Sequence, residues 1–148
     1  MNHRSAQRPH VVLLDSDPNV EHLLRRALTD CGISAPVTAH HDSADALVTI
    51  QSQLNGGRHA PAVLVIVDLK TTSSATRDFL ADLAELPFRH HIVVAAFIRD
   101  DSSGVGGELL REAGADAVFC RQADYAGYVR EIDAVWRLWV QKTGRNDM

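Results

Sequence analysis

Two aspartates stand directly after short apolar runs, and they are the residues of this sequence best placed to do chemistry. Asp15 follows the run at residues 11–14, and Asp68 follows the run at residues 63–67. Short, continuous apolar runs rich in β-branched residues are typical of strands buried on both faces of a parallel sheet. Because the carboxyl ends of parallel strands meet at one edge of the sheet, we expect the two carboxylates to converge there.

Carboxylates that converge in this way repel one another, and a hard divalent cation such as Mg²⁺ relieves the repulsion. A carboxylate held beside Mg²⁺ can also accept a phosphoryl group, because the cation neutralises charge on the phosphoryl oxygens. The alternative is that each aspartate simply caps the loop or helix that follows its strand. The pair therefore predicts either a phosphoryl acceptor site or two local caps.

The elements that must position these aspartates alternate along the chain. Further strand patterns occupy residues 33–40, 92–96 and 117–120. Pro36 within the first of these indicates an edge strand. Between the strands lie segments with apolar residues at steps of three and four, which predict amphipathic helices at residues 18–31, 43–56, 79–86, 109–113 and 123–141. The alternation predicts an α/β fold, a doubly wound five-stranded parallel sheet with helices on both faces.

Composition limits the classes of function. The 148 residues suit a single domain, with a core at about 10–141 between short flexible tails. A net charge of -4 gives no electrostatic reason to expect nucleic acid or a membrane as a partner. No stretch resembles a signal peptide or a membrane helix. Cys31 and Cys120 are predicted to be buried, reduced thiols, so we expect a cytoplasmic protein.

Three segments, in this order and at this spacing, resemble the response-regulator receiver family. They are LLDSDPNVEHLLRRAL from residue 13, VLVIVDL from residue 63 and REAGADAVFCR from residue 111, and the resemblance spans roughly residues 10 to 140. It implies the flavodoxin-like receiver fold with strand order 2-1-3-4-5. It also implies a non-enzymatic role in two-component signal transduction, with a histidine kinase or a downstream signalling protein as the partner.

The resemblance assigns roles around the acidic edge. Asp68 matches the phosphoacceptor of the family, and Asp15 matches its first acidic metal ligand. Ser16 stands where the family has a second carboxylate, and a neutral hydroxyl is a weaker ligand for Mg²⁺. Asp17 compensates only if its side chain points the same way. We therefore expect a weak or absent Mg²⁺ site built from Asp15, Ser16, Asp17 and Asp68, and no other cofactor.

The remaining family positions also depart from the pattern. The switch serine or threonine matches Ala95, or Ala96 if the register differs by one residue, and alanine has no hydroxyl for a phosphoryl oxygen. The family's lysine matches Arg121, which keeps the charge but not the geometry of an ammonium group, and Gln122 replaces the proline that follows. The resemblance thus implies a degenerate phosphorylation site.

Two regions are candidate contact surfaces. On the last helix, Tyr128, Trp136 and Trp139 belong to an apolar stripe that is wider than a single core-facing side requires. Either the whole stripe packs on the sheet, or part of it forms an exposed patch for a partner protein or a homodimer. The polar, glycine-containing loop at residues 97–107 is the second candidate surface.

The histidine pairs His40-His41 and His90-His91 are interpreted as solvent-exposed strand ends. Adjacent residues of a strand point to opposite faces, so neither pair readily shares one metal ion.

Three functional hypotheses follow. The first is a pseudo-receiver, a receiver with a degenerate site that acts through protein–protein interaction. The alternative is a phosphorylatable single-domain response regulator in a His–Asp phosphorelay, with Mg²⁺, Asp68 as nucleophile and Arg121 as charge stabiliser. A weaker alternative is a flavodoxin-like domain that binds a small molecule.

Overall fold

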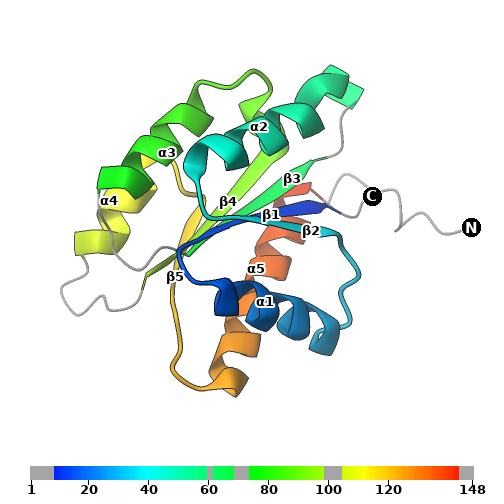
Figure 1. Cartoon of the computed structure of the whole chain (residues 1–148), viewed down its shortest axis with the longest axis vertical. Coiled ribbons are helices and arrows are strands. Elements are labelled where there is room, and N and C mark those ends of the chain that lie inside the picture. The colour runs from blue at the N-terminus through cyan, green and yellow to red at the C-terminus, as the bar shows by residue number, and fades with distance from the viewer. Residues whose placement is uncertain (1–8, 60–61, 69–73, 99–104, 144–148) are drawn as a thin grey trace, which may run out of the picture.

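The apolar runs pair into one parallel sheet with the strand order β2-β1-β3-β4-β5 (Figure 1). The computed structural model describes residues 9–59, 62–68, 74–98 and 105–143. Within them the strands are β1 (His10–Asp15), β2 (Val37–His40), β3 (Val63–Asp68), β4 (Ile92–Ile98) and β5 (Ala117–Cys120). The predicted doubly wound sheet and its strand order 2-1-3-4-5 are confirmed.

Helices cover both faces of this sheet (Figure 1). On one face lie α1 (Pro18–Asp30) and α5 (Tyr125–Thr143), and on the other lie α2 (Ser43–Gln53), α3 (Ser74–Ala84) and α4 (Val105–Ala113). Short 3-10 helices follow α2 at Leu54–His59 and precede β4 at Arg89–His91. Because successive strand residues point to opposite faces, Leu13 packs towards α1 and α5 while Leu14 packs towards the other three helices.

The start and end of α1 are set by local side chains. The Asp17 carboxylate accepts the Asn19 N–H at 3.0 Å, and Pro18 occupies the first helical position, where its missing N–H costs nothing. At the other end Gly32 has φ +76°, and the Ile33 N–H donates to the Leu28 carbonyl at 2.8 Å. This closure takes up the chain after the helix. The strand predicted over residues 33–40 therefore begins only at Val37.

Both β4 and α4 extend further into the predicted loop at 97–107 than the sequence indicated. β4 continues through Phe97 and Ile98, which are both buried, because the apolar run stays between its neighbouring strands. α4 begins at Val105, so Gly106 and Gly107 lie in a helix and not in the predicted loop. Residues 99–104 of the predicted contact loop at 97–107 lie outside the described residues.

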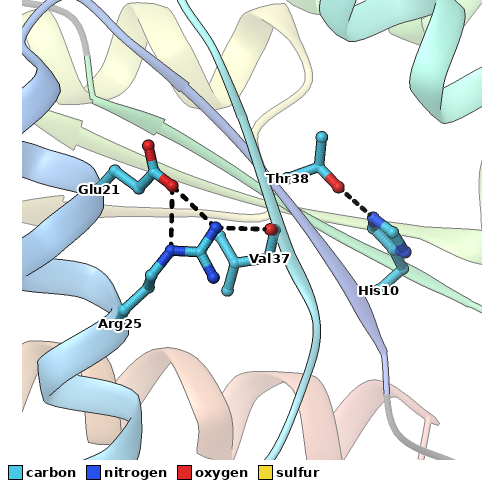
Figure 2. Close-up of polar contacts among 5 residues, drawn as sticks. All are labelled: His10, Glu21, Arg25, Val37 and Thr38. Carbon is cyan, nitrogen blue, oxygen red and sulfur yellow. Dashed lines mark hydrogen bonds and ion pairs between the residues drawn. The ribbon is translucent and has the colours of Figure 1, made fainter.

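Polar side chains connect edge strand β2 to α1 and β1 through hydrogen bonds (Figure 2). Arg25 of α1 donates to the Val37 carbonyl at 2.9 Å and pairs with Glu21 at 2.8 Å. His10 of β1 lies 2.8 Å from the Thr38 hydroxyl. Edge strands offer unpaired backbone groups to other chains, so Arg25 both positions β2 and covers one of those groups.

The two cysteines differ in exposure. Cys120 is exposed, contrary to its predicted burial, because it ends the edge strand β5, and Cys31 is half-buried. Among the described residues, no helix has the length and apolar character needed to cross a membrane.

We expect His10→Gln to flatten the loss of thermal stability on acidification. Burial lowers the pKa of His10 below its ordinary value of 6.5. As the pH falls below about 6.5, His10 is therefore protonated in the unfolded chain before it is protonated in the folded protein. The free energy of unfolding decreases over this range, until the pH passes the lower pKa of His10 in the folded protein. Circular dichroism melts at about pH 7.5, 6.5 and 5.5 should show a shallower decline of Tm for the variant. His22→Gln, at an exposed site of α1, is the control, and equal slopes for wild type and His10→Gln would contradict the prediction.

Candidate functional site

Asp15 and Asp68 lie directly opposite each other at the carboxyl ends of β1 and β3. The parallel register pairs Leu14 with Val67 and then Asp15 with Asp68. The residues are 0% and 2% exposed, respectively. The topology thus brings together the two carboxylates, as the sequence predicts.

Asp15 is held by a residue that the sequence analysis did not assign to the site. His41, which follows β2, places its Nδ1 atom 2.8 Å from Asp15 Oδ1 and 3.3 Å from the Asp15 carbonyl oxygen. The Asp17 N–H donates to the same Oδ1 at 3.1 Å. The other oxygen, Oδ2, is buried and has no hydrogen-bond partner among the described residues. One oxygen of this carboxylate therefore accepts hydrogen bonds, and the other is buried with no hydrogen-bond partner among the described residues.

The electrostatics of this contact follow from burial. Desolvation raises the pKa of the Asp15 carboxyl, and this effect outweighs the opposing pull of His41 and of the Asp17 N–H. The hydrogen bond to Asp15, followed by the charge of its carboxylate, raises the pKa of His41.

Asp68 contacts the predicted cation. Arg121 Nη1 lies 3.3 Å from Asp68 Oδ2, and both side chains are largely buried. The Arg121 N–H donates to the Ile98 carbonyl at 2.7 Å, which fixes its backbone after β5. Its guanidinium also lies 5.7 Å from the ring centre of Tyr128, within the range of a cation–π contact.

The residue after Arg121 packs closely on α5. A side chain at Gly127 would come within 2.7 Å of Gln122 Cβ, so only glycine fits there. The Asp124 carboxylate accepts the Gly127 N–H at 2.9 Å at the start of the helix. Gln122 thus packs closely against the first turn of α5, in the short connection between Arg121 and this helix.

The end of β4 carries no hydroxyl beside Asp68. Ala95 pairs with Ile66 and Ala96 with Val67, one residue short of the acceptor. Phe97 follows Ala96 as Asp68 follows Val67, so Phe97 is the β4 residue level with Asp68. Its ring stacks on Phe119 at 5.5 Å and lies 6.1 Å from the ring of Tyr128. This aromatic cluster was not predicted, because the strand was expected to end at residue 96.

Ser16 and Asp17 do not join the buried pair. Ser16 is exposed. Asp17 uses its carboxylate as the N-cap of α1, where it accepts the Asn19 N–H. The buried carboxylates at the strand ends are therefore those of Asp15 and Asp68.

The structure buries two of the three residues that were considered for an interface on α5. Tyr128 and Trp139 are each 3% exposed and pack in the core against the sheet. Trp136 is half-buried against the same cluster. The helix needs a wide apolar side because it packs on both the sheet and α1, so Tyr128 and Trp139 are core residues.

The donor set fits a divalent cation only in part. The buried Asp15 Oδ2 and the neighbouring Asp68 carboxylate supply hard oxygen ligands of the kind that Mg²⁺ prefers. Among the described residues, however, no group of three or more histidine, cysteine, aspartate or glutamate side chains could hold a metal ion. Asp15 and Asp68 are the residues that would hold Mg²⁺, and with two carboxylates they would hold it weakly.

No family model and no curated protein sequence matches the chain. Its structure is similar to that of a response regulator in red light signalling of R. palustris, with 21% identity over 91% of this chain and 96% of that one and a TM-score of 0.71. A response regulator from Hahella chejuensis matches with 17% identity over 89% and 95% and a TM-score of 0.73. A phosphorylated cyanobacterial phytochrome response regulator matches with 15% identity over 90% and 94% and a TM-score of 0.69.

Proposed function

We propose that this chain, which has the fold of response-regulator receiver domains, is a signalling module that acts by contact with a partner protein and without an aspartyl phosphate. The observation that carries the proposal is the state of the two carboxylates. His41 contacts Asp15 at 2.8 Å and Arg121 contacts Asp68 at 3.3 Å, so basic side chains of the chain itself contact both carboxylates. A site neutralised from within has less need of a metal ion.

The neighbouring positions support the same conclusion. Ser16 offers a neutral hydroxyl where a metal-binding carboxylate would be needed, and Ala95 and Ala96 offer no hydroxyl to a phosphoryl oxygen. Phe97, level with Asp68 on β4, packs within an aromatic cluster. Each change removes an interaction that would stabilise a bound phosphoryl group. The partner is a histidine kinase or a downstream signalling protein, as the fold implies.

A phosphorylatable response regulator is the second candidate. It is favoured by the contact of Arg121 with Asp68, which keeps a cation beside the acceptor, and by the matched structure of a phosphorylated response regulator. In that case Mg²⁺ would neutralise charge on the phosphoryl oxygens. Asp68 would receive the phosphoryl group, and Arg121 would stabilise the resulting charge.

Beryllofluoride, a phosphoryl mimic, separates the two candidates. At about 10 mM Mg²⁺ we expect no saturable amide shifts near Asp15, Asp68 or Arg121 in NMR spectra of the wild-type chain, because the acidic site holds the ion weakly. Ser16→Asp adds the missing carboxylate and should bring such shifts back, which makes it the positive control. Saturable shifts in the wild type that disappear in Asp68→Asn would establish the phosphorylatable response regulator instead.

A further inference from the structure

We propose that His41 is an internal lock on the acidic site: its imidazole holds the Asp15 carboxylate and competes with a divalent cation for it. The inference rests on the proposed function and names a contact that weakens metal binding at the site. His41 is not one of the acidic residues of the site, and the proposal predicts that removing its imidazole increases the affinity for Mg²⁺.

The contact geometry gives the lock its mechanism. His41 Nδ1 reaches both Oδ1 and the backbone oxygen of Asp15, at 2.8 and 3.3 Å. The Asp17 N–H adds a further donor to Oδ1. A cation that uses both oxygens of this carboxylate must therefore displace the imidazole, since two donors already occupy Oδ1. A cation bound through Oδ2 alone would still share the charge of this carboxylate with the imidazole and the Asp17 N–H, and would therefore be held less strongly.

The position of His41 is fixed by the contacts of the strand before it. The register pairs Leu14 with His40, so the chain leaves β2 beside the end of β1, where Asp15 stands. The neighbouring His40 lies 2.8 Å from the Thr49 hydroxyl of α2. On the other side Arg25, itself paired with Glu21, holds the Val37 carbonyl (Figure 2). These contacts hold His41 at the acidic edge and restrict how far it can move away.

The lock is also able to open without unfolding the core. The His41 side chain is 59% exposed, whereas Asp15 is 0% exposed. Rotation of the imidazole into solvent thus frees the carboxylate while the rest of β1 stays packed. A lock of this kind weakens metal binding by the strength of one partly solvated contact, and it does not abolish it.

The test is a Mg²⁺ titration of the folded full chain, followed by the amide signals of Asp15, Ser16 and Asp68. His41→Ala should bind Mg²⁺ about twofold to fivefold more tightly than the wild type, which is the range for one partly exposed charged contact. His22→Ala, at an exposed histidine of α1, should leave the affinity unchanged. An affinity that is unchanged in His41→Ala would overturn the lock. A weaker affinity would also overturn it, because His41 would then be a metal ligand.

A second variant separates the contact from the size of the side chain. His41→Gln keeps an N–H donor and should bind Mg²⁺ with an affinity between those of the wild type and His41→Ala. If His41→Ala and His41→Gln both fail to bind Mg²⁺ up to about 50 mM, the lock is also overturned, since its removal does not open the site. The ratio of affinities tests the lock, whereas beryllofluoride binding by the wild type tests the proposed function. Failure of one is therefore distinguishable from failure of the other.

Discussion

Phe97→Ala should lower the free energy of unfolding by about 3 to 5 kcal/mol, the range for truncating a buried aromatic side chain. Phe97 is 3% exposed, and its ring packs against Phe119 and Tyr128 on the face covered by α1 and α5. The truncation leaves a cavity between β4, β5 and α5. Urea unfolding followed by tryptophan fluorescence measures the loss, because both tryptophans of the chain lie on α5.

The matched control for this variant is Val48→Ala. Val48 is 65% exposed on α2, so its truncation should change the free energy of unfolding by less than about 0.5 kcal/mol. A loss below about 1 kcal/mol for Phe97→Ala would mean that the end of β4 can collapse around the gap. The aromatic cluster would then not be the packing centre of this end of the sheet.

Arg121→Met should cost about 3 kcal/mol of stability, because it removes a cation from a buried carboxylate while keeping much of the side-chain volume. Asp68 is 2% exposed, and Arg121 lies 3.3 Å from it. In the double variant Arg121→Met with Asp68→Asn, most of the loss should be recovered, since residue 68 then carries no buried charge for the arginine to neutralise. Urea unfolding of the four proteins forms a double-mutant cycle that measures the coupling.

The control pair for the cycle lies on the surface of α5. Arg137 and Asp133 are 2.8 Å apart, but the arginine side chain is 80% exposed. Solvent screens such a pair, so its cycle should give a coupling below about 0.5 kcal/mol. If the Arg121–Asp68 cycle gives an equally small coupling, the contact does not neutralise Asp68, and the main support for the proposed function is lost.

Much of the fold is predictable because its signals are local. The apolar runs of β1 and β3 are continuous, the periodic face of α1 is strong, and Gly32 marks the helix end with a backbone conformation that suits glycine. Parallel pairing follows from the alternation of strands and helices, and it brings Asp15 and Asp68 together without any knowledge of side-chain contacts. The positions of Asp15 and Asp68 were therefore predictable, because each residue ends a strand of the parallel sheet.

The errors lie where burial depends on distant segments. Tyr128 and Trp139 carry the same periodic signal whether they face the core or a partner, and only their packing against the sheet and α1 decides that they are buried. The end of β4 was placed too early because the apolar run continues into a polar loop without a breaking residue. Phe97 was missed for that reason.

From the sequence alone follow the alternation of strands and helices and the two carboxylates at the strand ends, because strand periodicity and residue type are local properties; the strand order was implied by the resemblance to the receiver family. Only the tertiary structure decided which cations reach those carboxylates. His41 lies 26 residues from Asp15, and Arg121 lies 53 residues from Asp68. Contacts across such separations depend on strand register and on the path of each loop, and no local pattern in the chain encodes them.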